Sequence, residues 1–475
     1  MKRIILCLAA MLSVGLVGRA SAQQFELSLE KALEIALSDN PTIQVAGLEI
    51  ERQDWVRKQT IGSLLPGVSV SGQYSYSIVK QEMAKGLSFG ADNSISTQAS
   101  LSLPLFAPTV YETLKMNQTQ LEQAVESARS SKITLANEVK KGFYNILLAE
   151  QSLVVLKESE KSITKTVENT ENMYKQGLAS EYDLLSAQVQ LSNLKPNIIQ
   201  TENSIKTSKM LLKMYLGLPA EADFTLVGSL DQMADQASVS TTPTNEVDLS
   251  NNPDLRALDF QARLLNHQLR LTNASRMPTI AAFSNFIFSG NDNTMDFGSM
   301  MGGGIAGGAG GAGGAGGGQS KPAAKKEWWW QNPLSAGISI SIPLFSGGRN
   351  LNKASEIRNT INQLSLQRDY LTQSVNIQAT NAFNAILTAR EKMSSNEITV
   401  RQAQKAYDIA LVRYNQGVGT ILELNSSELS LTQAKLNYSQ ATYDYLAARA
   451  DYEKIIGEGF EIEGEQESDN TPNNQ

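Results

Sequence analysis

Two carboxylates, Asp183 and Glu423, occupy matching positions in the sequence, each a few residues after a Tyr-x-x-Gly motif. Carboxylates gathered around a narrow opening select and bind cations, and this is the chemistry that the two residues could perform. Acidic residues are also common in the first turn of a helix, where the helix dipole stabilises them without any further role. Both interpretations stay open at the level of the sequence.

The sequence shows no Ser/His/Asp set and no cluster of metal-ligating residues. His267 is the single histidine and stands on a predicted helix beside Gln268 and Arg270, so we expect a surface or packing role for it. The single cysteine, Cys7, lies in the N-terminal apolar segment, which leaves no cysteine for disulfides or metal sites after processing. We therefore expect no enzyme, no cofactor and no metal.

The N-terminus has the pattern of a secretory signal peptide. Lys2 and Arg3 precede an apolar stretch, and Ala20-Ser21-Ala22 provides a small-residue cleavage site, so residues 1–22 are predicted to be removed. The net charge of −7 then becomes −10, because three basic and no acidic residues are lost. An acidic surface disfavours nucleic acid as a partner.

The rest of the chain is duplicated. Asn40-Pro41 corresponds to Asn252-Pro253 at an offset of 212 residues, whereas the motifs at Tyr174 and Tyr414 are offset by 240. The second copy carries the extra residues as a Gly/Ala-rich loop insertion at about 298–327. A unit longer than 200 residues is too long for a solenoid repeat.

We predict four parts of the chain from this duplication and from composition. After the signal they are a first repeat at 23–245, a second repeat at 246–457 and an acidic disordered tail at 458–475.

Four segments of about ten residues alternate apolar and polar side chains, as strands with one apolar face do. They run from Val68 to Tyr76, Ile95 to Leu105, Thr279 to Phe288 and Ile338 to Leu344. Their length suits tilted membrane strands, although a soluble β-sandwich shows similar alternation. Four strands cannot close a barrel and open edges are not tolerated in lipid, so a membrane location requires several chains to share one barrel.

Trp328, Trp329 and Trp330 come just before the fourth predicted strand. Three tryptophans beside a membrane strand suit an aromatic girdle at the membrane interface. The alternative is a loop that folds back on the barrel.

The remaining sequence predicts helices, because it is polar, poor in glycine and carries apolar residues on one stripe. The long ones are predicted at about 110–173, 181–216, 350–413 and 421–456. Helices of this length and polarity project into water instead of crossing lipid. They form two hairpins, and Gly177 and Gly417 allow the tight reversal at each tip.

This combination resembles the outer-membrane efflux protein family typified by TolC. The resemblance rests on the duplicated Asn-Pro pairs, the Pro-Leu-Phe strand ends at Phe106 and Phe345, and the paired Tyr-x-x-Gly turns, and covers roughly residues 25–457. It implies a mixed α and membrane β fold. A homotrimer would form one 12-stranded β-barrel, with four strands per chain, continuous with a long periplasmic α-helical barrel.

The resemblance also implies the function: a passive exit duct of a tripartite efflux pump or type I secretion system in the outer membrane of a Gram-negative bacterium. The implied partners are outer-membrane lipid, a periplasmic adaptor (membrane fusion) protein and an inner-membrane transporter of the RND, ABC or MFS type. Adaptor contacts are expected at the helical tips, at Gly177, Leu178, Gly417 and Val418. The cargo is not implied.

By the same resemblance, Asp183 and Tyr414 correspond to members of the network that closes the periplasmic gate, and Glu423 to an acidic ring there. Two positions depart from the family pattern. The gate arginine falls on Gly419 and a second acidic ring falls on Ser426, so this gate is expected to be held differently.

Two other classes of protein compete with the duct. A structural or adhesive coiled-coil protein could use the long helices as a stalk, but it needs no internal repeat and usually has unbroken heptads. An enzyme on a helical scaffold lacks a catalytic set of residues here.

Overall fold

The computed structural model describes residues 25–79, 81–84, 87–89, 91–238, 248–293 and 327–458. The predicted signal peptide, nearly all of the predicted Gly/Ala-rich insertion and the tail beyond Glu458 lie outside these residues. The chain divides into two compact units. The larger is made of residues 1–52, 120–262 and 362–475, and the smaller of 53–119 and 263–361, so both halves of the sequence contribute to each unit.

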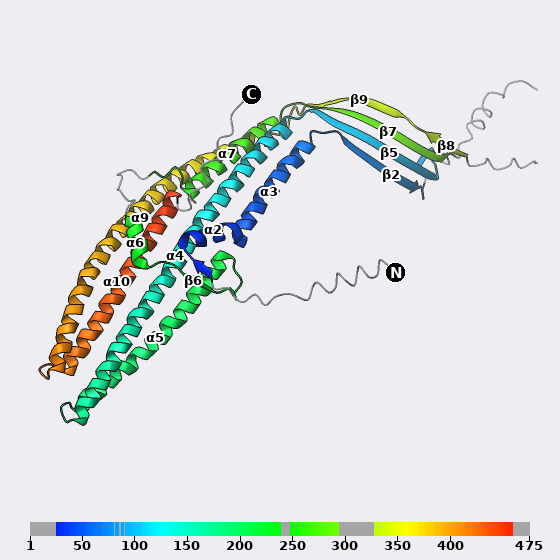
Figure 1. Ribbon diagram of the computed structural model, residues 1–475. Coiled ribbons are helices and arrows are strands. Elements are labelled where there is room, and N and C mark those ends of the chain that lie inside the picture. Colours follow the sequence, from blue (N-terminus) through cyan, green and yellow to red (C-terminus); the bar gives the residue numbers. More distant parts are fainter. Residues whose placement is uncertain are drawn as a thin grey trace, which may run out of the picture. The chain divides into compact units, whose positions relative to one another are not determined.

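The smaller unit contains an antiparallel sheet in the order β2-β5-β7, with β8 and β9 both paired to β7 (Figure 1). These strands are β2 (Gly67–Tyr76), β5 (Asn93–Phe106), β7 (Thr279–Asn293), β8 (Glu327–Gln331) and β9 (Leu334–Ser341). A separate pair is formed by β3 (Gln81–Ala84) and β4 (Leu87–Phe89). Within the described sheet, β2 and β9 each have one edge without a partner strand.

The fourth predicted strand is displaced and divided. It was expected to reach Leu344, but β9 ends at Ser341, opposite Thr279, where its partner strand β7 begins. The tryptophans precede β9, as expected, and form a strand of their own, β8, which pairs with the end of β7. Trp330 lies opposite Gly290, where a Cβ atom would stand 2.6 Å from the indole ring, so a larger residue there would displace the indole.

The predicted long helices are confirmed, with ends shifted by at most two residues. They are α4 (Pro108–Lys175), α5 (Glu181–Leu216), α9 (Arg349–Asn415) and α10 (Ile421–Ile456). Four shorter helices accompany them: α2 (Leu29–Asp39), α3 (Pro41–Gly62), α6 (Leu230–Ser238) and α7 (Pro253–Ala274). A parallel pair of three-residue strands, β1 (Phe25–Leu27) and β6 (Phe224–Leu226), was not predicted.

None of the helices in the described ranges combines the length and the apolar character that crossing a membrane requires.

The core of the larger unit lies where α2, α4, α5, α6 and α10 meet. Phe143 of α4, Leu212 of α5 and Tyr445 of α10 are among its fully buried side chains. Phe143 belongs to the apolar stripe that the sequence places on this helix. Burial of side chains this large contributes roughly 1.5–3 kcal/mol each, so this cluster is a main source of the unit's stability.

Each duplicated Asn-Pro pair joins the start of one helix to the end of another. Asn40 accepts a hydrogen bond from the backbone N–H of Thr42 (2.7 Å), which caps α3, and its Nδ2 donates to the carbonyl of Tyr215 near the end of α5 (2.7 Å). Gly217, which ends α5 with φ +70°, lies so close that a Cβ atom would stand 2.8 Å from the Asp39 carbonyl oxygen. We call this arrangement a helix-end clamp.

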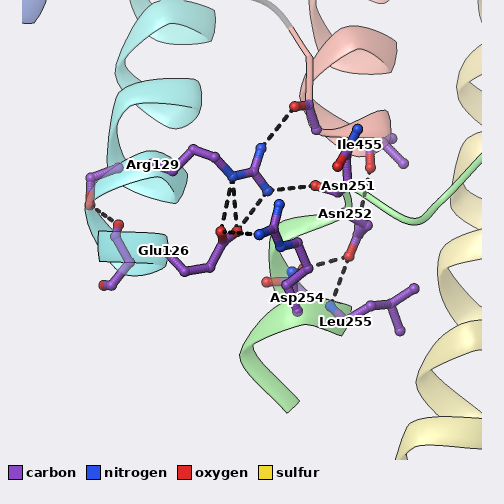
Figure 2. Close-up of polar contacts among 11 residues, drawn as sticks. Glu126, Arg129, Asn251, Asn252, Asp254, Leu255 and Ile455 are labelled. Carbon is purple, nitrogen blue, oxygen red and sulfur yellow. Dashed lines mark hydrogen bonds and ion pairs between the residues drawn. The ribbon is translucent and has the colours of Figure 1, made fainter. Parts of the chain in front are cut away.

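The second copy repeats the clamp at Asn252 (Figure 2). Its side-chain oxygen accepts from the N–H groups of Asp254 (3.1 Å) and Leu255 (3.0 Å), and its Nδ2 donates to the carbonyl of Ile455 (2.7 Å). Gly457 takes the place of Gly217, with φ +82° and no room for a Cβ atom beside Asn251. The duplicated motif is therefore a structural device that ties each helical hairpin to the short helix that follows an Asn-Pro pair.

Among the described residues, ion pairs reinforce only the second clamp. Arg129 of α4 donates to the carbonyls of Asn251 (2.7 Å) and Gly457 (3.0 Å) and pairs with Glu126 (2.7 Å). Arg256 of α7 pairs with the same buried carboxylate (3.1 Å). These contacts fix α7 and the end of α10 on α4 (Figure 2).

Asn252→Ala is expected to lower the free energy of unfolding by about 1–3 kcal/mol, because it removes a helix cap and leaves the partly buried Ile455 carbonyl without its donor. Asn252→Asp keeps the cap acceptor but sets a carboxylate oxygen against the Ile455 carbonyl at a buried position, so it should also destabilise the protein. Denaturant unfolding of the full-length protein measures both. Equal stability of Asn252→Ala and the unmodified chain would contradict the clamp.

Candidate functional site at the helix tips

The two helical hairpins of the larger unit end in turns of the same construction. At the end of α4, the N–H of Gly177 donates to the Tyr174 carbonyl (2.9 Å) and that of Leu178 to the Met173 carbonyl (2.8 Å). This pair of bonds is the Schellman motif, in which a left-handed residue ends the helix. Gly177 supplies that residue with φ +68°.

The turn after α9 repeats this geometry. Gly417 (φ +72°) donates to Tyr414 (3.0 Å) and Val418 to Arg413 (3.0 Å). A Cβ atom at either turn glycine would meet open space, so only the backbone conformation requires glycine there. Leu178 and Val418 follow the glycines with their side chains exposed. All four residues predicted to contact an adaptor therefore lie together in pairs at the tips.

Asp183 is occupied by its own helix. Ser180 and Asp183 form a capping box: the carboxylate accepts from the N–H (3.0 Å) and hydroxyl (2.7 Å) of Ser180, and the Asp183 N–H donates back to that hydroxyl (3.1 Å). This is the local structural role that the sequence left open for the residue. Its part in a gate stays a prediction.

Glu423 is placed differently, although it occupies the corresponding position of α10. Thr420 caps this helix by accepting from the Glu423 N–H (3.2 Å), and the Glu423 side chain reaches toward Arg413 in the last turn of α9 (3.8 Å). Both side chains of this ion pair are about half exposed, 53% for Arg413 and 51% for Glu423. An exposed pair of this kind contributes at most about 1 kcal/mol.

Gly419, the position where the family pattern places an arginine, is crowded. A Cβ atom there would stand 3.0 Å from Cβ of Arg413 and 3.1 Å from the Tyr414 nitrogen. The arginine that faces Glu423 is instead Arg413, from the other side of the same turn. The sequence interpretation missed Arg413; its place in the last helical turn, opposite an acidic first turn, is the signal that could have found it.

Tyr414 links the two hairpins. Its side chain is 5% exposed and its hydroxyl lies 2.8 Å from that of Thr170, which is fully buried on α4. Around it pack Ala187 of α5 and Ile421 and Leu424 of α10. Burial raises the pKa of the Tyr414 hydroxyl, with a small addition from the charge of Asp183, so it stays a neutral hydrogen-bonding group at physiological pH.

Further polar contacts join the hairpins near the tips. Asn169 of α4 donates to Asn415 of α9 (2.9 Å), and Asn425 of α10 donates to Ser186 of α5 (3.4 Å). A groove of about 530 Å³ lies between α4 and α9, with Lys165, Tyr407 and Leu178 in its lining. Ser426 occupies the position at which the family pattern has a second acidic ring. Its side chain is exposed on α10.

The predicted interface tryptophans lie away from the tips. The three tryptophans belong to the smaller unit, where Trp330 stacks on Phe288 (centroids 4.9 Å apart) and on Trp328 (5.7 Å), so Trp328, Trp330 and Phe288 form an aromatic row on one face of the sheet. Within the described ranges, no three His, Cys, Asp or Glu side chains lie close enough together to hold a metal ion.

His267 has a packing environment. On α7 it contacts the Thr119 hydroxyl (3.2 Å), and its Nδ1 faces a carboxylate oxygen of Glu112 (3.9 Å). Burial, and then the charge of Arg270, lower the pKa of its imidazole.

Removing the Tyr414 hydroxyl tests the link between the hairpins. Tyr414→Phe is expected to cost about 1–2 kcal/mol of unfolding free energy, because the buried Thr170 hydroxyl then loses its partner. Thr170→Val should cost a similar amount, and the double variant should cost less than the sum of the two. Additive costs in denaturant unfolding would show that the two hydroxyls do not interact.

The comparisons with known proteins agree with this architecture. A model of the family described as "Outer membrane efflux protein" matches residues 32–218 and 247–458. Alkaline protease secretion protein AprF of Pseudomonas aeruginosa is 23% identical over 415 residues, covering 86% of this chain and 79% of that protein. Outer membrane protein TolC of Vibrio cholerae is 20% identical over 367 residues, 76% of this chain and 75% of the relative.

The crystal structure of the outer membrane protein VceC of Vibrio cholerae has the same fold. It superposes with a TM-score of 0.68 at 15% identity and covers 91% of this chain and 97% of its own. With both long segments matched by the family model, the chain belongs to the outer membrane efflux protein family and is an outer-membrane protein of a Gram-negative bacterium, related to efflux and secretion channels.

Proposed function

We propose that this protein is a passive outer-membrane exit duct of a tripartite efflux pump or type I secretion system. One observation carries the proposal: the sheet of one chain is open, with β2 and β9 unpaired on their outer edges in the described residues. Open edges are not tolerated in lipid, so copies of the chain must pair edge to edge. A closed barrel built in this way encloses a passage, as a duct requires.

A homotrimer satisfies this requirement, and it is the assembly that the resemblance to the family implies. β8 and β9 follow one another along β7, so they occupy one strand position and each chain contributes four positions. Three copies then give a 12-stranded barrel, in which β9 of one copy pairs with β2 of the next. The row of tryptophans on β8 would form part of an aromatic girdle at one membrane interface.

The long hairpins supply the periplasmic part of the duct. α4 with α5 and α9 with α10 are polar helices that reverse at exposed turns, and three copies would arrange them as an α-helical barrel. Their equal construction, with a clamp at one end and a Schellman turn at the other, supports an origin by duplication of one repeat. The repeats are those of residues 23–245 and 246–457.

The partners follow from the same architecture. A periplasmic adaptor protein would contact the tips at Gly177, Leu178, Gly417 and Val418, where the apolar side chains of Leu178 and Val418 are exposed. An inner-membrane transporter would supply the energy, so the duct itself needs no catalytic group. The name of AprF points to a secreted protease and other relatives are drug and solvent efflux proteins, so the cargo stays open between secretion and efflux.

At the tips, Asp183, Glu423 and Tyr414 would form the closed entrance. Tyr414 holds α9 to α4, and Glu423 of three copies would form a ring of carboxylates that binds cations. Arg413 lies within 3.8 Å of Glu423 and lowers the charge of this ring. The gate is therefore held by a tyrosine and by an arginine at position 413 instead of 419.

The mass of the detergent-extracted, full-length protein from the outer-membrane fraction tests the shared barrel. A trimer of the mature chain is expected, because it pairs every edge strand. A monomer, or protein recovered in the soluble periplasmic fraction, would leave the sheet edges open and would overturn the proposal.

Glu423→Gln combined with Asp183→Asn is expected to weaken block of the channel by divalent cations and to raise its resting conductance in a planar lipid bilayer. The ring loses its charge, and the capping box at Ser180 is weakened. Glu181→Gln is the matched control, since this exposed acid also lies in the first turn of α5. Unchanged block in the double variant would count against the gate.

A further inference from the structure

A buried carboxylate, Glu428, lies about two turns into α10 and has no part in the functions described above. Its side chain is 6% exposed, and no lysine, arginine or histidine of the described chain forms an ion pair with it. A buried carboxylate without a cation is costly in its ionised form. Glu428 therefore requires either a proton or strong hydrogen-bond donors.

Hydroxyl groups from three helices surround this carboxylate. From α4, Ser159 donates to one oxygen (2.9 Å) and Ser162 to the other (3.3 Å). Behind them, Thr432 of α10 donates to Ser159 (3.0 Å), and the Tyr407 hydroxyl of α9 lies 2.6 Å from that of Ser162. The network joins the first helical hairpin to the second in the half of the larger unit that leads to the tips.

The network satisfies both protonation states of Glu428, but in different orientations. When Glu428 is ionised, Tyr407 and Thr432 donate to the serines, and both serines donate to the carboxylate. When Glu428 is protonated, its own O–H can donate to Ser162, which then donates to Tyr407. Hydroxyl groups permit this reversal because each can donate and accept.

Other charged groups near Glu428 are already paired or more distant. Lys435 of α10 lies within electrostatic range but pairs with Glu158 of α4 (3.1 Å), and Asp408 of α9 acts on the nearby Tyr407. A cavity of about 130 Å³ adjoins the carboxylate, lined also by Ser162 and Tyr407. These two residues line the larger groove between α4 and α9 as well, so the hydroxyl network lies between the cavity and that groove.

We propose that Glu428 is a proton-dependent tie between the two helical hairpins. Its neutral form holds α4, α9 and α10 together near the tips, and its ionisation favours their separation, because separation hydrates the charge. The effect of Glu428 on opening of the entrance rests on the proposed duct. Its effect on the stability of the folded chain does not depend on that function.

The direction of the pH dependence follows from burial. Burial raises the pKa of the Glu428 carboxyl, and the hydrogen bonds from Ser159 and Ser162 oppose this effect without cancelling it. The folded protein then holds the proton more tightly than the unfolded chain does. The stability that Glu428 contributes is present below the pKa of the unfolded chain and is lost as the pH rises through the raised pKa of the folded state.

Glu428→Gln fixes the site in a neutral form of the same size. The first repeat carries glutamine at the corresponding position, Gln188, 240 residues earlier. Thermal unfolding of the full-length, detergent-extracted protein between pH 5 and pH 8 gives the first measurement. The Tm of Glu428→Gln should exceed that of the unmodified protein by an amount that grows with pH, on the order of 1–3 °C at pH 8 for a protein of this size.

Two further variants make this result specific. Glu158→Gln removes an exposed carboxylate that lines the same cavity, so its effect on Tm should not grow with pH in this way. Ser162→Ala removes one donor to the ionised form and so raises the pKa of Glu428 further, and the loss of stability with rising pH should become larger and extend to higher pH. A Tm difference for Glu428→Gln that is the same at every pH would overturn the tie.

Conductance in a planar bilayer distinguishes a failure of the Glu428 proposal from a failure of the proposed duct. The resting conductance of the unmodified channel should rise with pH, and that of Glu428→Gln should stay low and change little. An equal pH response in both proteins would overturn the control of the entrance. If neither protein conducts, the proposed duct fails, and the Tm series alone decides whether the tie exists.

Discussion

The helix-end clamps are the constraint on which the arrangement of the larger unit depends. A helix ends with unsatisfied carbonyl groups and begins with unsatisfied N–H groups, and a buried junction of two such ends needs partners for both. One asparagine provides them: its oxygen caps the helix that begins, and its amide donates to the helix that ends. The clamps fix where each long hairpin starts, and the position of the tips follows from the helix lengths.

The two halves share this construction but differ in their charged groups. At the clamps, Arg129 and the buried Glu126 of the first half and Arg256 of the second act only at the second clamp. At the tips, Asp183 is held by its own cap, whereas Glu423 faces Arg413. Above the tips, Gln188 is exposed where its counterpart Glu428 is buried. The two halves thus share a framework, and they differ in the ionisable groups that it carries.

The sequence predicted the long helices to within two residues, because a 3.6-residue apolar period over many turns leaves little ambiguity. It placed Asp183 and Glu423 at the tips because each follows a Tyr-x-x-Gly turn at the end of a predicted helix. The end of β9 was misplaced and the strand β8 was not predicted, since alternation of side chains along one segment does not show where its partner strand begins. Thr170 and Glu428 were missed because their partners lie on other helices more than 240 residues away, a separation that no local pattern records. Arg413 was missed although its partner, Glu423, is only ten residues further along the chain.

The second clamp also has a consequence for the order in which the chain folds. Arg129 donates to the carbonyl of Gly457, 328 positions further along the sequence, and Asn252 reaches Ile455 across 203 positions. These bonds can form only when nearly the whole polypeptide has been synthesised. Until then Arg129 has Glu126 as a partner but not the carbonyl at the end of α10, and Asn252 has no helix end to join. The finished protein therefore closes at its last helix, in a step that synthesis itself delays.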